Sequence, residues 1–364
     1  MKWTWATAAL LIAAQAWSLD PTVDEGETTS YHVYVNGGKE HLSKFVMDAQ
    51  SGKLTREADI AIGGAAGAMD INPDGSIMFI CLRSAKQFLS LRVDKSTGAL
   101  TPISKVDVVD GPPYIKTDNS GRFLLAAHMP GAVSVHGIAA DGSLSQEPLQ
   151  LIFTEVHAHS IQLDRSNRFA FVPHTCPTNA ISQFRFDEAT GELSANHPPQ
   201  IQPETEEGPR HFVFHPDKDI LYSVNENGST VSGHHFDPEL GTLSSFQVIS
   251  TLPEGWDGES NTTAEIRITP DGRHLYASNR GHDSLAIFEV ADDGTLTAKG
   301  HQPTDPVPRF FALDPGGNFV ICAGQKTGHI VTYRIDHDSG QLNQLERVEV
   351  GKSPAWIQFV KKSS

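Results

Sequence analysis

A short turn signature recurs seven times along the chain, and each copy places an acidic residue close to Gly-x-Leu. The glycines of the seven copies are Gly52, Gly98, Gly142, Gly191, Gly241, Gly294 and Gly340. Neighbouring copies are 44 to 53 residues apart, which is the period expected for a four-stranded propeller blade. The repeat therefore favours one large repetitive architecture over two ordinary domains.

Each repeat also carries a second turn, which lies between two short apolar segments. Pro73-Asp74-Gly75 and Pro216-Asp217-Lys218 are two examples, and such residues are typical of hairpins between strands. No long stretch has helical periodicity. We therefore predict an all-β, seven-bladed β-propeller over residues 31–360, because closing the ring removes exposed sheet edges. Its seventh blade would combine residues 31–62 with a C-terminal strand at 355–359, and residues 361–364 would form a tail.

The first 19 residues have the composition of a signal peptide. Lys2 precedes an apolar run at residues 6–14, and small residues at Ala14-Gln15-Ala16 or Ala16-Trp17-Ser18 suit cleavage. The apolar run is too short to span a bilayer, and a polar segment follows at residues 20–30. We expect a periplasmic or secreted protein with no membrane attachment in its mature form, or a cytoplasmic one if this segment is not cleaved.

Charge and cysteine content narrow the possible partners. The formal net charge is −16 and the pI is near 5.4, which argues against nucleic acid or an anionic membrane as the partner. The three cysteines, Cys81, Cys176 and Cys322, are widely spaced and show no pattern of metal ligands. We expect a monomer or a homodimer.

Stacking the repeats shows where they differ. Counting five residues back from the residue before each hairpin turn gives Gly67, Pro113, His159, Arg210, Ala264, Arg309 and Pro354. Counting eleven forward gives Arg83, Met129, Thr175, Glu226, Arg280 and Gln325. Because adjacent strands of a blade are antiparallel, both sets should lie on the same rim of the propeller, around the mouth of the central channel.

The polar members of these sets suit a small anionic ligand. Guanidinium groups bind phosphate or carboxylate, while an imidazole and a carboxylate can transfer protons. Each arginine could instead bridge neighbouring blades. His157 and His159 could also begin a metal site, but no third ligand stands out nearby in the sequence, so we expect neither a metal nor a cofactor.

Several motifs of the chain resemble those of the seven-bladed propeller lactonase family, which includes bacterial 6-phosphogluconolactonases and fungal 3-carboxy-cis,cis-muconate cyclases. They are His159-Ser160, Gly208-Pro209-Arg210-His211, Val224-Asn225-Glu226, Asn279-Arg280 and Pro308-Arg309. The resemblance covers residues 31–359 and is closer to the bacterial lactonases. It implies that the catalytic residues are His159, Arg210, Glu226 and Arg280.

The resemblance implies hydrolysis of a small anionic sugar lactone, such as 6-phosphogluconolactone or a related gluconolactone. Either His159 or Glu226 would be the general base, and Arg210 or Arg280 would stabilise the oxyanion. The expected substrate-binding residues are Arg83, His211, Arg309 and Gln325. Two alternatives remain open at this point: cyclisation of a carboxylated muconate, and a non-catalytic exported propeller that binds a ligand or partner.

Overall fold

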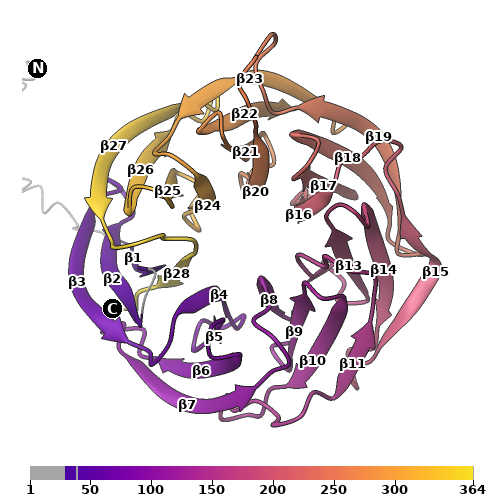
Figure 1. The fold of residues 1–364 in the computed structure, drawn as a ribbon. Coiled ribbons are helices and arrows are strands. Elements are labelled where there is room, and N and C mark those ends of the chain that lie inside the picture. Colours follow the sequence, from indigo (N-terminus) through magenta and orange to yellow (C-terminus); the bar gives the residue numbers. More distant parts are fainter. Residues whose placement is uncertain (1–28, 38–39, 364) are drawn as a thin grey trace, which may run out of the picture.

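The computed structural model describes residues 29–37 and 40–363. These residues form 28 strands in seven four-stranded sheets, which stand side by side in a ring around a central axis (Figure 1). The predicted all-β, seven-bladed propeller is confirmed. The proposed signal peptide at residues 1–19 lies outside the described residues. Within the described part of the chain, no helix has the length and apolar character needed to cross a membrane.

The strands of each blade are given from the axis outwards. Blade 1 holds β28 (Ile357–Lys361), β1 (Ser30–Asn36), β2 (His41–Asp48) and β3 (Leu54–Ala61). Blade 2 holds β4 (Ala66–Ile71), β5 (Ile77–Leu82), β6 (Gln87–Val93) and β7 (Leu100–Asp107). Blade 3 holds β8 (Tyr114–Thr117), β9 (Phe123–His128), β10 (Ala132–Gly137) and β11 (Gln150–Phe153). Blade 4 holds β12 (Gln162–Leu163), β13 (Phe169–His174), β14 (Ala180–Phe186) and β15 (Leu193–Ile201).

The remaining blades follow the same order. Blade 5 holds β16 (Pro209–Phe214), β17 (Ile220–Asn225), β18 (Thr230–Asp237) and β19 (Thr242–Ser250). Blade 6 holds β20 (Thr262–Ile268), β21 (His274–Arg280), β22 (Ser284–Val290) and β23 (Leu296–Pro303). Blade 7 holds β24 (Pro308–Leu313), β25 (Phe319–Gly324), β26 (His329–Ile335) and β27 (Leu342–Glu349).

Blade 1 joins the two ends of the chain, as predicted. Strand β28 pairs antiparallel with β1, and Val33 lies opposite Phe359. The strand begins at Ile357 rather than at residue 355. The reason is local: the main-chain amides of Ala355 and Trp356 donate to Oδ1 of Asn36, at 2.7 and 2.8 Å, instead of pairing with the main chain of β1.

The recurring turn signature holds neighbouring blades together. The hydroxyl of Tyr222 in blade 5 donates to the carbonyl of Gly294 in blade 6 (2.6 Å), and Tyr276 in blade 6 donates to Gly340 in blade 7 (2.9 Å). Gly241 has a φ of +69°, and a Cβ atom there would lie 2.0 Å from the ring of Phe169 in blade 4. The glycine thus meets two demands, a left-handed backbone and close contact between blades.

The innermost strands are irregular at the rim that was predicted to hold the site. The register of β16 against β17 shifts between Pro209 and His211, and that of β24 against β25 shifts between Pro308 and Phe310. In blade 6 the shift lies between Thr263 and Ile266. Such bulges interrupt the strict alternation of side chains and redirect them. The charged residues near the axis lie in or beside these bulges.

Candidate active site

Residues that are far apart in the sequence line one pocket at the axis. Its lining residues are Gly67, Ala68, Arg83, Pro113, Arg210, His211, Arg309, Phe310, Ala355 and Trp356. Both sets of equivalent repeat positions are represented, the first by Arg210 and Arg309 and the second by Arg83. A wider hollow at the opposite rim is bordered by Pro73 and Lys95, and none of its described lining residues is an arginine or histidine.

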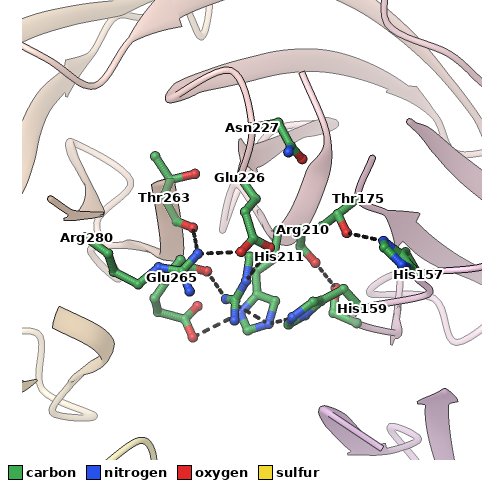
Figure 2. Close-up of polar contacts among 12 residues, drawn as sticks. His157, His159, Thr175, Arg210, His211, Glu226, Asn227, Thr263, Glu265 and Arg280 are labelled. Atoms are coloured by element: carbon green, nitrogen blue, oxygen red, sulfur yellow. Dashed lines mark hydrogen bonds and ion pairs between the residues drawn. The ribbon is translucent and has the colours of Figure 1, made fainter. Parts of the chain in front are cut away.

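Glu226 links two of the arginines (Figure 2). It directly follows β17, and its Oε1 accepts a hydrogen bond of 2.6 Å from Nη2 of Arg280, the last residue of β21. Its Oε2 lies 3.2 Å from Nε of Arg210 in β16. That distance is short enough for an ion pair, but the N–H is not aligned for a hydrogen bond. The carboxylate therefore bridges blades 5 and 6.

Positive charge exceeds negative charge at this rim. Burial and the neighbouring guanidinium groups of Arg280 and Arg309 lower the pKa of Arg210 to about 9. Burial also lowers the pKa of Arg309, and Arg280 and Arg83 add to that effect. Burial alone would raise the pKa of Glu226, but Arg210 and Arg280 outweigh it and hold that pKa below its usual value. A bound anion would relieve the repulsion among the arginines.

His159 and His211 lie side by side (Figure 2). Nδ1 of His159 is 3.2 Å from Nε2 of His211, and Nδ1 of His211 is 3.1 Å from Oε2 of Glu265 in β20. Burial, followed by the positive charge of Arg210, lowers the pKa of both histidines well below the usual imidazole value. Both rings are therefore neutral near pH 7.

Aromatic side chains pack beside His211 and help to exclude water. The ring of Tyr114 meets the His211 ring edge-on at a centroid distance of 5.1 Å, and Trp356 meets Tyr114 at 5.5 Å. Phe310 stacks on Trp356 at 4.3 Å. This apolar packing lowers the local dielectric constant, so the charged groups interact more strongly than they would in water.

Of the expected residues, the pocket lining includes Arg83, Arg210, His211 and Arg309 but not His159, Glu226, Arg280 or Gln325. Gln325 directly follows β25 and is partly exposed, and it does not belong to the lining of the axial pocket. His157 bonds through Nδ1 to the carbonyl of Cys176 at 2.6 Å, away from His211. Within residues 29–37 and 40–363, no three His, Cys, Asp or Glu side chains form a group suited to a metal ion.

Sequence reasoning missed Glu265 and its partner Arg267. Glu265 is fully buried, and its Oε1 accepts a bond of 2.8 Å from Nη1 of Arg267. Stacking the repeats selected the neighbouring Ala264, because the bulge in blade 6 shifts the pattern. The available signal was the occurrence of two charged residues in a strand, TTAEIRI, that lies closest to the axis, where apolar residues are expected.

Comparison with known proteins adds to this geometry. Residues 28–359 match the family described as Lactonase, 7-bladed beta-propeller. A 6-phosphogluconolactonase of Pectobacterium carotovorum is 38% identical over 308 residues, which is 84% of this chain and 91% of that protein. One from Klebsiella pneumoniae is 34% identical and covers 84% and 92% of the two chains. Among solved structures, a periplasmic gluconolactonase of Pseudomonas aeruginosa has a TM-score of 0.84 at 26% identity, over 92% of this chain and 100% of that one.

Proposed function

Because this chain belongs to the seven-bladed β-propeller lactonase family, we propose that its axial site hydrolyses a sugar lactone. The proposed substrate is 6-phosphogluconolactone or a related gluconolactone. Relatives named 6-phosphogluconolactonase and a structural neighbour named gluconolactonase support this choice. We propose that the reaction uses the side chains of the rim and no bound metal.

The observation that carries the proposal is the excess of positive over negative charge at the site. Four arginines, Arg83, Arg210, Arg280 and Arg309, interact with one another, and the carboxylates that oppose their charge are Glu226 and, for Arg210, also Glu265. The Nε atoms of Arg210 and Arg280 are both buried without a hydrogen-bond partner. Buried polar groups are nearly always hydrogen-bonded, so an anionic ligand that supplies acceptors fits these groups. A phosphate, a carboxylate or the oxyanion of a tetrahedral intermediate would do so.

The proposed reaction begins with attack of water on the lactone carbonyl carbon. His159 removes a proton from the water as the new C–O bond forms, and Arg210 or Arg280 donates to the oxyanion. Such a donor contributes about 3 to 4 kcal/mol of transition-state stabilisation. The intermediate then expels the ring oxygen, which takes the proton back from His159. The product is the open-chain hydroxy acid.

Glu226 has a different part in this proposal. Its pKa is lowered by the arginines, and both of its oxygens face guanidinium groups, so it is a weak base with no proton to give. We propose that it holds Arg210 and Arg280 in position. His159 is neutral, and within the described residues its Nε2 has no hydrogen-bond partner, which favours it as the base. Arg83 and Arg309 would bind the phosphate of a phosphorylated substrate.

We further propose that the protein is exported. The signal-peptide composition of residues 1–19 supports this, as does the likeness to a neighbour described as periplasmic. An exported enzyme would meet extracytoplasmic gluconolactones, so its preference between phosphorylated and unphosphorylated substrates bears directly on its role.

The first test is a pH-stat assay of the purified protein with EDTA present, on 6-phosphogluconolactone and on glucono-δ-lactone. We expect acid release faster than the spontaneous rate on at least one lactone. Arg210→Ala should lower turnover by about 10²- to 10³-fold, as loss of an oxyanion donor does. Arg165→Ala is the matched control, because Arg165 forms an exposed ion pair with Asp219 away from the pocket, and it should leave the rate unchanged.

No acceleration on either lactone would contradict the proposal. Lactone formation from a carboxylated muconate would then favour a cyclase, and ligand retention without turnover would favour a binding protein. Thermal unfolding of each variant shows whether the fold survives the substitution. If Glu226→Gln abolishes turnover while His159→Gln does not, the assignment of the base is wrong.

A further inference from the structure

Four buried or half-buried side chains form one hydrogen-bonded row across three blades. His159 comes from the segment before β12, His211 from β16, and Glu265 and Arg267 from β20. The row runs from Nδ1 of His159 to Nε2 of His211 (3.2 Å), and from Nδ1 of His211 to Oε2 of Glu265 (3.1 Å). It ends where Arg267 donates to Oε1 of Glu265 at 2.8 Å. His211 is 3% exposed and Glu265 is 0% exposed.

The proton of His211 is placed by its neighbours on both sides. Nη1 of Arg210 lies 3.4 Å from Nε2 of His211, and a guanidinium group can donate but cannot accept. Nε2 of His211 must therefore be the acceptor, and the one proton of this neutral ring is on Nδ1. That proton faces Glu265, whose other oxygen already accepts from the Ile266 amide (3.0 Å) and from Arg267.

Opposing effects act on the protonation state of Glu265. Burial has the largest effect and raises its pKa above the usual value, although Arg267 and the Ile266 amide oppose the rise. Three N–H donors surround the carboxyl group, and hydrogen bonds from donors favour the charged form. The group is therefore an acceptor on both oxygens.

The tautomer of His211 in turn fixes the tautomer of His159. Since Nε2 of His211 accepts, Nδ1 of His159 must carry the only proton of its neutral ring. The lone pair of Nε2 is then free, and within the described residues Nε2 has no hydrogen-bond partner. The same ring keeps 6% of its surface exposed. His159 is thus oriented like a histidine whose base nitrogen is made available by a carboxylate behind it.

We propose that Glu265 and His211 are positioning residues, which hold His159 in the tautomer that presents Nε2 as the catalytic base. The catalytic half of this inference rests on the proposed function, whereas the tautomer itself does not. Both ring nitrogens of His211 are engaged within the protein, so its part in proton transfer is exerted through His159, although its ring also lines the axial pocket. Arg267 favours the charged form of Glu265 and, by donating to Oε1, leaves Oε2 turned towards His211.

A single substitution distinguishes a role of Glu265 in setting the His159 tautomer from a role in core packing alone. In Glu265→Gln the side-chain oxygen must take the place of Oε1, because both the Ile266 amide and Arg267 donate there. The side-chain amide would then point at Nδ1 of His211 and donate to it. Nη1 of Arg210 would keep its bond to the Ala264 carbonyl and give up the longer 3.4 Å contact with Nε2 of His211. The His211 proton would then move to Nε2, which would donate to Nδ1 of His159. The His159 proton would therefore move to Nε2, and the base would be lost.

The experiment reads the tautomers directly by long-range ¹H–¹⁵N NMR of the ¹⁵N-labelled protein near neutral pH. The signals of His159 and His211 are assigned from the spectra of His159→Gln and His211→Gln. We expect both rings in the Nδ1–H form in the unsubstituted protein, and both in the Nε2–H form in Glu265→Gln. Turnover in Glu265→Gln should fall by about 10²- to 10⁴-fold with KM little changed, because no substrate contact is removed.

Asp110→Asn is the matched control. Asp110 pairs with His128 in blade 3, so its loss should alter the His128 signals and leave His159 and turnover unchanged. His159 in the Nε2–H form in the unsubstituted protein would overturn the proposal even if Glu265→Gln fails to fold. An unchanged His159 tautomer in Glu265→Gln would also overturn it, whatever the activity. Inverted tautomers with normal turnover would overturn the catalytic half and, with it, His159 as the base.

Discussion

At the scale of single residues, the site combines neutral imidazoles with crowded guanidinium groups. His159 faces His211, Arg210, Arg280 and Arg309, all of which disfavour a positive charge on its ring. An imidazole in such surroundings is a weak base, but it remains unprotonated in mildly acidic solution. Its lowered basicity suits a lactone ester, which is reactive enough to need only modest assistance.

The lowered pKa predicts how activity depends on pH. A base works in its unprotonated form, and because the pKa of His159 is lowered, the ring keeps that form below the ordinary imidazole value of about 6.5. We expect kcat/KM to stay constant from about pH 8 through 6.5 and to fall only in more acidic solution. Initial rates corrected for spontaneous hydrolysis provide the measurement. An inflection at or above 6.5 would contradict the prediction.

Stability must be followed over the same pH range. The unfolded chain binds protons at its histidines below about pH 6.5, whereas the folded chain resists protonation of His159 and His211. The free energy of unfolding should therefore decrease as the pH falls through that value. Thermal unfolding at each pH separates this loss from the loss of the catalytic base.

Individual site residues were predictable to different degrees. The axial position of Arg210 and of Arg309 followed from equivalent positions in the repeat, because differences between copies stand out against a constant framework. Glu265 did not follow, since the bulge in blade 6 places Ala264 at the equivalent position. The engagement of His211 by Glu265 joins two blades, and no pattern within one repeat encodes such a contact.

At the scale of single elements, the recurring turn has two structural roles. It reverses the chain between the two outer strands of a blade, and it packs against the preceding blade. In Asp237, Oδ1 accepts the amides of Glu239 and Leu240, both at 2.9 Å, which fixes the turn. The turn itself was predicted from sequence. Its contact with the preceding blade was not, because the sequence does not show which side chain will fill the space above the glycine.

Comparison of two glycines shows how much packing against the preceding blade contributes to stability. Gly241 and Gly255 have φ angles of +69° and +73°, but a Cβ atom at Gly241 meets Phe169 at 2.0 Å and one at Gly255 meets nothing within 4 Å. Replacing either glycine by alanine should lower the free energy of unfolding by roughly 1 to 2 kcal/mol, because the backbone there is left-handed. Gly241→Ala should lower the free energy of unfolding by about 1 to 3 kcal/mol more, because the added methyl group overpacks against Phe169. Equal losses in urea unfolding would show that contact between blades is unimportant there.

At the scale of the whole molecule, the described ring is complete without the start of the chain. β1 begins at Ser30, and the amide of Lys362 donates to the carbonyl of Ser30 at 2.9 Å. The number of blades and the joining of both chain ends were predictable, because a repeated unit with one incomplete copy at each end has only one way to close. The residues that bond across blades depend on the assembled ring.

Export can be tested at this scale. Removing residues 1–19 deletes no part of the described ring, so a processed chain should fold as the ring in Figure 1. We expect protein recovered from outside the cytoplasm of an expressing bacterium to begin at Trp17 or Leu19, as determined by mass spectrometry. Leu11→Arg, which interrupts the apolar run, should leave the chain uncleaved. Intact Met1 in recovered wild-type protein would contradict the prediction.

The pairing of β28 with β1 has a consequence for how the protein is made. Ile357–Lys361 leaves the ribosome among the last residues, although its partner strand was among the first to be synthesised. Until then β1 has a neighbour on one side only, and its other edge offers unpaired amides and carbonyls. A chain that stops before residue 357 retains that open edge. Closure of the ring therefore has to wait until this late strand has been made, and a chain that lacks it differs from the closed ring in its exposed backbone.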